Sequence, residues 1–386
     1  MSRTGRVAAA LLVGVVGVAC SSSHPSASKS TSTTNPGSAR LGTVPGSEWE
    51  KVSPASQGLD ASKLDTIAKT AQTNASNCLA VVRNGKLADE WYFRGTTADT
   101  PRQVFSATKS FTSTLIGIAQ DEGKLRITDS ASRWIPEWRG TPAQVVTVRD
   151  LLSNDSGREW SLRTDYVELI RAKDQTAFAV SLRQTSAPGT VWAYNNSAIQ
   201  TLQRVLRGVT GEDVGTFAQQ HIFGPLGMRD TTMSADAAGN TQTYTGIRST
   251  CRDMARFGLM VLDHGRWGNR QIVSSGWLVA ATGASSTPLN AAYGYLWWLN
   301  RAGVIAGPLA ASDISAAANR TTTRGQLVPG APVDMFWAIG LGNQIVQIDP
   351  GSKTVVVRLG AASTRPRTFA PKDASRVVTE ALLDKT

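Results

Sequence analysis

Strand-forming sequence lies near both ends of this chain, and a long stretch of helical sequence separates the two regions. Near the start, residues 79–83 and 86–93 flank Asn84-Gly85, the dipeptide that most strongly favours a tight β-hairpin. Three more segments with strand character lie near the other end: residues 333–339, 344–348 and 354–359. We therefore expect an α+β fold, in which an antiparallel β-sheet is flanked by helices and split in sequence by a mostly α-helical insertion.

The sequence between the two strand regions carries helix signals. Phe111, Leu115 and Ile118 fall on one stripe of a helix, and residues 147–150 and 250–253 have the pattern of capping boxes that open further helices. A last helix is expected near the end of the chain, with these residues on one face: Val377, Val378, Ala381 and Leu382.

These elements divide the folded part into two lobes. An αβ lobe takes about residues 48–100 and 290–384, and an α lobe takes about residues 101–289. Ligand sites prefer the cleft between such lobes, so we expect a site there.

The first residues have the pattern of an export signal. A short basic segment precedes an apolar run over residues 7–19, which is too short to span a membrane comfortably. The small residues before Cys20 resemble a bacterial lipobox, which predicts that residues 1–19 are a cleaved signal peptide and that Cys20 carries a diacylglycerol. Because Gly17 stands where leucine is preferred, secretion with an unmodified Cys20 is the alternative. We expect an extracytoplasmic protein, anchored by lipid to the bacterial cell membrane.

Residues 20–47 are rich in Ser, Thr and Pro and are expected to be a tether, because they cannot bury enough apolar surface to fold. The folded domain is then expected over residues 48–384. The chain has 40 Lys and Arg against 29 Asp and Glu, a net charge of +11. Removal of residues 1–19, with two arginines and no acid, leaves +9. The basic residues are dispersed and form no stripe with aromatic side chains between them, so no nucleic-acid partner is expected.

Two cysteines remain after Cys20. Cys78 and Cys251 form an even pair, and in an exported protein such a pair is expected to be a disulfide that closes a long loop. Two buried thiols are the alternative.

Histidine is scarce in this chain. The three histidines are His24, His221 and His264, and none has the sequence context of a nucleophile elbow. A zinc site would draw on several histidines, and a Ser-His-Asp triad would need one in that context, so we expect neither, and no metal or cofactor.

A serine and a lysine stand one helical turn apart in Ser106-Ala-Thr-Lys109, directly before the apolar helix stripe. This spacing places both side chains on one face, so that a neutral, buried lysine can take the serine proton. The helix N-terminus also offers N–H groups to an oxyanion. The same pattern at Ser26 to Lys29, in the tether, shows how little the spacing means alone. The structural alternative for Ser106 is a helix N-cap.

A second pair of polar residues, Tyr194 and Asn196, follows in Tyr194-Asn195-Asn196, before another apolar helix stripe. Near Ser106 and Lys109, the Tyr194 phenol could move a proton to a leaving group, and Asn196 could bind both the lysine and a carbonyl oxygen. The structural alternatives are a packed aromatic ring and an N-cap.

A third element, Gly340-Leu-Gly-Asn-Gln344, lies between two expected strands. Its backbone N–H groups could face a pocket, and its structural alternative is a glycine-rich hairpin bend.

The order of these three elements within a β, α, β arrangement resembles the serine β-lactamase and penicillin-binding-protein superfamily. The chain is most similar there to the class C β-lactamase-related group with 6-aminohexanoate-dimer hydrolases and family VIII carboxylesterases. The resemblance covers about residues 48–384 and extends to several supporting stretches: residues 105–111, 150–157, 223–228, 249–257 and 293–298.

This resemblance implies roles for the residues of the three motifs. Ser106 would be the acylated nucleophile, Lys109 the base and Tyr194 a partner in proton transfer. The oxyanion hole would come from the backbone of Ser106 and of Gln344 or Asn343. The fold would be β-lactamase/transpeptidase-like, and the activity that of a serine hydrolase.

The third motif departs from the family pattern, in which a Lys-Thr-Gly or His-x-Gly sequence helps to hold a substrate carboxylate. Leu341 supplies no charge here, so we expect a small ester or linear amide as substrate. A cell-wall D,D-peptidase or β-lactamase, and a non-catalytic binding lipoprotein, are the alternatives. Four tryptophans could wall the pocket or simply belong to the core: Trp192, Trp297, Trp298 and Trp337.

Overall fold

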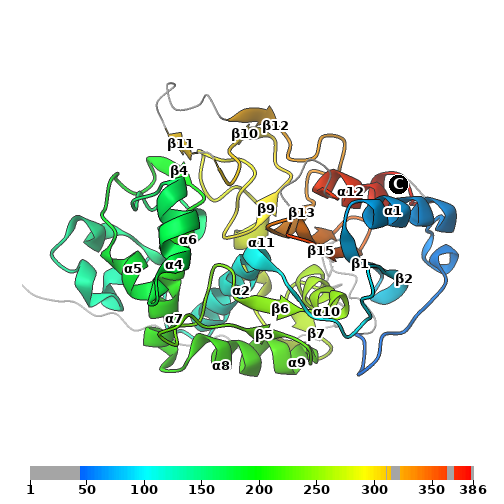
Figure 1. The fold of residues 1–386 in the computed structure, drawn as a ribbon, viewed down its shortest axis with the longest axis horizontal. Coiled ribbons are helices and arrows are strands. Elements are labelled where there is room, and N and C mark those ends of the chain that lie inside the picture. The colour runs from blue at the N-terminus through cyan, green and yellow to red at the C-terminus, as the bar shows by residue number, and fades with distance from the viewer. Residues whose placement is uncertain (1–43, 310, 314–321, 363–368, 384–386) are drawn as a thin grey trace, which may run out of the picture. The chain divides into compact units, whose positions relative to one another are not determined.

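Six strands form the central sheet: β1 (Ser76–Arg83), β2 (Lys86–Tyr92), β9 (Trp298–Leu299), β13 (Phe336–Gly340), β14 (Gln344–Asp349) and β15 (Thr354–Gly360). The structure, a computed structural model, describes residues 44–309, 311–313, 322–362 and 369–383. Neighbouring strands are antiparallel, in the order β2-β1-β15-β14-β13-β9 (Figure 1). Strands from the start of the chain therefore lie beside strands from its end, and the expected α+β fold is confirmed.

Helices cover both faces of this sheet. They are α1 (Ala61–Thr73) and α12 (Pro371–Thr379) on one face and α10 (Cys251–Leu262) on the other (Figure 1). Gln347 of β14 donates a hydrogen bond to the Ala374 carbonyl on α12. Its neighbour Val346 packs on α10, where a Cβ on Gly258 would lie 2.9 Å from a Val346 methyl group. Because successive strand residues point to opposite faces, the sheet is buried on both sides.

Most of the regular elements between β2 and β9 are helices, as expected. Besides α10, these helices are α2 (Thr108–Asp121), α3 (Val148–Ser153), α4 (Leu169–Arg171), α5 (Gln175–Ser181), α6 (Asn196–Gln200), α7 (Leu202–Thr210), α8 (Val214–Ala218), α9 (Gly224–Leu226) and α11 (Ser275–Thr282).

Short strands that the sequence did not predict also occur in this region and after β9. They are β3 (Arg102–Gln103), β4 (Val191–Ala193), β5 (Thr232–Met233), β6 (Ile247–Ser249), β7 (Arg266–Trp267), β8 (Arg270–Gln271), β10 (Gly303–Ile305), β11 (Ala311–Asp313) and β12 (Thr323–Gly325). Two or three residues are too few to show an alternating pattern, so such strands carry no sequence signal.

One expected capping box is present and the other is only half formed. At α3, Thr147 and Asp150 exchange hydrogen bonds between side chain and backbone in both directions. At α10, the Asp253 N–H donates to the Thr250 hydroxyl, 3.1 Å away. The Asp253 carboxylate instead accepts hydrogen bonds from Asp230 and Thr231, so the predicted reciprocal bond is wrong. A tertiary partner has replaced the local one.

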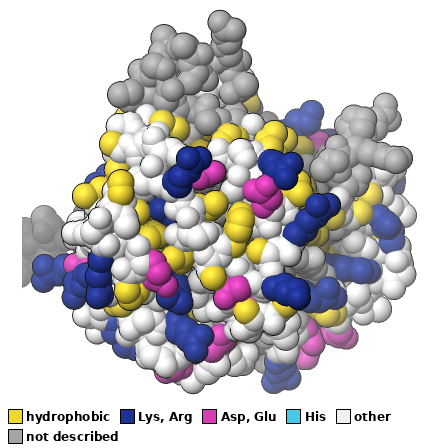
Figure 2. Space-filling model, turned by 60° about the vertical axis from the view of Figure 1, so that its left-hand side comes forward, with side chains coloured by type: hydrophobic (Ala, Val, Ile, Leu, Met, Phe, Trp, Pro, Cys, Tyr) yellow, Lys and Arg dark blue, Asp and Glu magenta, His cyan; other side chains and the backbone are white. Residues whose placement is uncertain are grey.

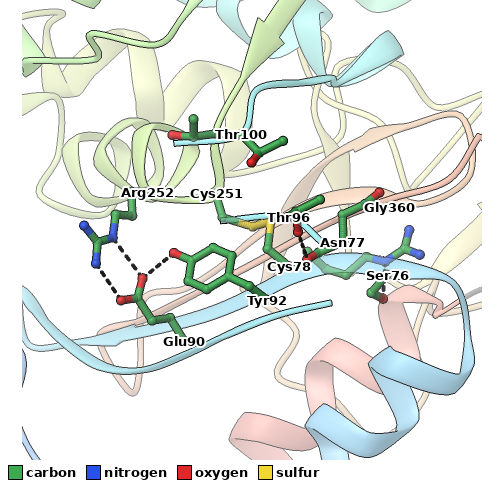
Figure 3. Close-up of a disulfide and its surroundings, with 12 residues drawn as sticks. Ser76, Asn77, Cys78, Glu90, Tyr92, Thr96, Thr100, Cys251, Arg252 and Gly360 are labelled. Atoms are coloured by element: carbon green, nitrogen blue, oxygen red, sulfur yellow. Dashed lines mark hydrogen bonds and ion pairs between the residues drawn. A yellow bond between two sulfur atoms is a disulfide. The ribbon is translucent and has the colours of Figure 1, made fainter. Parts of the chain in front are cut away.

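A disulfide joins Cys78 on β1 to Cys251 at the start of α10 (Figure 3). The two cysteines are 173 residues apart in sequence, and both are buried. The bond therefore ties the sheet to the helix that covers one of its faces.

The surface charge is mixed on the face that Figure 2 shows, where Lys and Arg side chains are interspersed with acidic and hydrophobic ones. Within the described ranges, no helix is both long and apolar enough to cross a membrane. The expected signal peptide over residues 1–19, Cys20 and the tether up to residue 43 lie outside the described residues.

Candidate active site

Ser106 lies in a single 3₁₀ turn, Phe105–Ala107, that runs directly into α2. Phe105 has a φ of 48°, a left-handed conformation that costs energy for a residue with a side chain. The end of β13 packs against this turn. A Cβ on Gly340 would lie 2.0 Å from the Val104 carbonyl oxygen and 3.2 Å from the Ala107 nitrogen, so only glycine fits there. The backbone of the third motif thus meets the backbone that carries Ser106.

Lys109 is buried beneath Ser106, with 1% of its surface exposed. Its Nζ atom lies 2.9 Å from Ser106 Oγ, 2.7 Å from Asn196 Oδ1 and 3.0 Å from the Tyr244 carbonyl oxygen. A neutral amine has two N–H groups for Asn196 and Tyr244 and keeps its lone pair for the Ser106 proton. Burial lowers the pKa of Lys109 to about 7, although the charge of Asp165 opposes this change. Lys109 can therefore be a base near neutral pH.

Tyr194 follows β4 and lies beside the lysine. Its ring centroid is 4.7 Å from Lys109 Nζ, and its ring stacks on Trp298 at 5.6 Å. Burial raises the pKa of Tyr194, and a hydrogen bond with Ser106 opposes the rise only in part. The phenol is therefore protonated at neutral pH. It can donate this proton if a neighbouring group then supplies another one to the phenolate.

Asn196 is the first residue of α6. The N-cap is its neighbour Asn195, whose side chain accepts a hydrogen bond from the Ala198 N–H at 2.8 Å. The N-cap alternative for Asn196 is therefore wrong, and its side chain is left to accept from Lys109.

The expected oxyanion residues lie in the hairpin between β13 and β14. Gln344 pairs with Gly340 across this hairpin, and its buried side chain donates to the Leu341 and Gly360 carbonyls. Arg358 donates to the carbonyl of Asn343 at 2.9 Å. The backbone of Gly340 packs against the Ser106 turn, while Leu341 is 48% exposed.

The four tryptophans divide into two pairs. Trp192 and Trp298 lie 6.5 Å apart, ring to ring, in an aromatic cluster with Tyr194 and Tyr293. The other two belong to the core, where Trp297 stacks on Phe257 of α10 and Trp337 donates to Gln347 under α12. The aromatic wall beside Tyr194 therefore comes from the first pair.

Ser106, Lys109, Tyr194 and Asn196 form the Ser106 cluster, and the sequence analysis missed two residues that contribute to it. The Tyr244 carbonyl binds Lys109 from a loop before β6. Asp165 accepts hydrogen bonds from the first turn of α6, 31 residues further along the chain. A backbone carbonyl and a lone aspartate carry no motif, so no local signal could have identified either one.

This sheet and its helical insertion are shared with serine hydrolases of the β-lactamase and penicillin-binding-protein superfamily. A D-alanine carboxypeptidase AmpC from Burkholderia cenocepacia superposes with a TM-score of 0.56 at 22% identity, over 82% of this chain and 98% of the other. A class C β-lactamase in complex with cefoxitin gives 0.58 at 18%, over 82% and 97%. These two likenesses concern the fold.

The sequence comparisons agree with the fold. The model described as Beta-lactamase matches residues 65–380, so the chain belongs to the β-lactamase family and is a serine hydrolase. A 6-aminohexanoate-dimer hydrolase from Paenarthrobacter ureafaciens is 23% identical over 320 residues, which cover 78% of this chain and 76% of that protein. The resemblance stated from the motifs is confirmed.

Proposed function

We propose that this protein is an exported serine hydrolase that cleaves carboxylic esters or small linear amides through an acyl-enzyme on Ser106. One observation carries the proposal. The Nζ atom of Lys109 is buried and lies 2.9 Å from the Ser106 oxygen, which is hydrogen-bond distance between a nucleophile and its base.

In the first step, neutral Lys109 takes the Ser106 proton while Oγ attacks the substrate carbonyl carbon. The tetrahedral intermediate collapses when its C–O or C–N bond breaks and the leaving atom gains a proton. Tyr194 lies beside both residues and delivers this proton from its phenol, which is then reprotonated by Lys109. An alcohol or amine departs, and the acyl group stays on Ser106 as an ester.

In the second step, a water molecule attacks this ester. The basic pair Lys109 and Tyr194 takes one water proton, and Ser106 Oγ leaves and recovers a proton. The products are a carboxylic acid and the free enzyme, so the cycle needs no metal or redox partner.

The negative oxygen of both intermediates needs N–H donors. The Ser106 N–H is one, as the motif indicates. The second donor would come from the third motif, whose Gly340 packs on the Ser106 turn and pairs with Gln344 across the hairpin.

Two observations bear on the choice of substrate. Leu341 stands where the superfamily motif has a polar or basic residue, so that position supplies no partner for a substrate carboxylate. The relative from Paenarthrobacter ureafaciens is named for hydrolysis of an amide-linked dimer. We infer that small esters or linear amides are preferred over D-Ala-D-Ala peptides and β-lactams.

We also infer export and a lipid anchor on Cys20. The basic start, the apolar residues 7–19 and the small residues before Cys20 support this inference. Mass spectrometry of Cys20 peptides from the native host would detect the diacylglycerol, and an unmodified mature Cys20 would indicate secretion instead.

The deciding experiment is intact mass spectrometry of the purified protein and its Ser106→Ala variant after brief exposure to 4-nitrophenyl butyrate, with product release followed in parallel. We expect a transient butyryl adduct and turnover that both disappear in the variant. Equal turnover by both proteins would refute the mechanism. Stable acylation by penicillin, with no ester turnover, would favour the peptidase alternative, and no adduct with any substrate would favour a binding protein.

A further inference from the structure

Asp165 is a fully buried carboxylate that no step of the proposed mechanism uses. It lies in a π-helical turn, Thr164–Glu168, directly before α4. Such turns are rare and frequently occur at functional sites. Its side chain points at the first turn of α6, the helix that begins with Asn196.

The Asp165 carboxylate satisfies backbone donors at the start of α6. One oxygen accepts hydrogen bonds from the Ser197 N–H at 3.2 Å and the Ser197 hydroxyl at 2.7 Å, and the other accepts from the Asn196 N–H. The next N–H, of Ala198, is bound by the N-cap Asn195. The first three N–H groups of α6, which have no partner within the helix, are thus all bound.

Asn196 links this anchor to the catalytic pair. Its backbone N–H is bound to Asp165, while its side-chain oxygen accepts from Lys109 Nζ at 2.7 Å. A change in the position of this turn would move the Asn196 oxygen, and the lysine amine would move with it relative to Ser106.

Asp165 also affects the charge of Lys109. The negative charge raises the pKa of Lys109 and so opposes the larger effect of burial. Burial raises the pKa of Asp165 itself to about 6, against its hydrogen bonds and the charge of Lys109, so Asp165 is ionised above that pH. The other titratable groups that interact with it are phenols with raised pKa values, which stay neutral: Tyr166, Tyr194 and Tyr244.

We propose that Asp165 is a positioning residue of this serine hydrolase, which fixes the first turn of α6 and, through Asn196, holds the Lys109 amine against Ser106. The inference rests on the proposed function of Ser106 and Lys109. Asp165 acts through Asn196 and not by direct contact with the substrate or with Ser106. Its removal should therefore change the catalytic rate constant and its pH dependence more than substrate binding.

The test compares Asp165→Asn with wild-type protein in hydrolysis of 4-nitrophenyl butyrate from pH 5.5 to 9. We expect kcat to fall about tenfold or more at pH 8 with a nearly unchanged KM, because misplaced catalytic groups cost rate. We also expect the acidic limb of the kcat/KM profile to move to lower pH by about one unit, since loss of a nearby negative charge lowers the lysine pKa.

Asp253→Asn is the matched control. Asp253 is likewise buried and accepts a backbone and a hydroxyl hydrogen bond, at 2.9 Å each, but it lies at α10, outside the Ser106 cluster. Its loss should lower the melting temperature and leave the acidic limb in place. Ser197→Ala, which removes one hydroxyl donor from Asp165, should lower kcat severalfold and serves if Asp165→Asn does not fold.

The outcomes separate this inference from the proposed function. If Ser106→Ala keeps full hydrolysis, the proposed function fails. If Ser106→Ala is inactive but a folded Asp165→Asn, or Ser197→Ala in its place, keeps the wild-type kcat and acidic limb, only the role of Asp165 is overturned. An equal limb shift in Asp253→Asn would also overturn it, because the effect would then be a general loss of stability.

Discussion

Arg252 on α10 donates hydrogen bonds to both carboxylate oxygens of Glu90 on β2, at 2.9 and 2.7 Å (Figure 3). The Tyr92 hydroxyl donates to the same carboxylate, whose side chain is only 4% exposed. Burial acts to raise the pKa of Glu90, but the hydrogen bonds from Arg252 and Tyr92 outweigh it and hold the pKa below its usual value. This ion pair joins β2 to α10, next to the disulfide that joins β1 to α10. The sheet and this helix are therefore linked by a covalent bond and by an ion pair.

Arg252→Met should lower the free energy of unfolding by about 2 kcal/mol, because hydrogen bonds to a charged group contribute about 1.5–3 kcal/mol. Urea denaturation at pH 7.5 measures the change. Since the pKa of Glu90 is lowered in the folded protein, the contribution is present above the unfolded pKa and is lost as the pH falls through the folded one. Arg163→Met, which breaks an exposed pair with Glu168, is the control and should cost less than about 1 kcal/mol. Equal losses would contradict this prediction.

Removal of the disulfide by Cys78→Ala together with Cys251→Ala should lower the free energy of unfolding by about 2–5 kcal/mol. The bond closes a loop of 173 residues, which limits the freedom of the unfolded chain. Denaturation of wild-type protein with and without reductant, compared with the double variant, measures the effect. A non-reducing peptide map that finds both thiols free would remove the basis of the expectation.

The pH dependence of hydrolysis should follow the protonation of Lys109. Only the neutral amine can accept the Ser106 proton, and the pKa of Lys109 is about 7. We therefore expect kcat/KM to rise about tenfold per pH unit below pH 7 and to level off above it. Lys109→Arg cannot lose its proton in this range and should reduce kcat/KM by about 10²- to 10⁴-fold. A flat profile from pH 5.5 to 9 in the wild type would exclude the lysine as the base.

Tyr194→Phe should separate proton transfer from packing. The variant keeps the ring that stacks on Trp298 and loses only the hydroxyl. We expect kcat to fall about 10²-fold, while the melting temperature stays close to that of the wild type. Wild-type kcat in the variant would show that the phenol takes no part in proton transfer.

Gly340→Ala should inactivate the enzyme by displacing the Ser106 turn, since the new methyl group would lie 2.0 Å from the Val104 carbonyl oxygen. The matched control is Gly351→Ala, where no atom lies within 4 Å of the added Cβ. Acylation by 4-nitrophenyl butyrate, followed by intact mass, should be lost in the first variant and unchanged in the second. Rapid acylation of Gly340→Ala would show that the third motif does not need this close contact.

The sequence predicted the sheet and the pairing of Ser106 with Lys109 because both depend on local patterns, strand alternation and helical spacing. The orientation of the Gln344 side chain could not be predicted from the sequence. This residue points into the sheet toward Gly360, sixteen residues away, and only the pairing of β14 with β15 brings the two together. The role of Asp165 could not be predicted for the same reason. It depends on hydrogen bonds to α6, and no local sequence pattern places that helix beside Asp165.

The position of β15 between β1 and β14 sets the order in which the domain can be completed during synthesis. The early hairpin of β1 and β2 lacks its inner neighbour until the ribosome has released residues as far as Gly360. Until then β1 exposes an open edge of unpaired N–H and C=O groups, which other chains could join. The sheet can therefore close only when nearly all of the domain has left the ribosome, and the edge of β1 stays open to pairing with other chains until then.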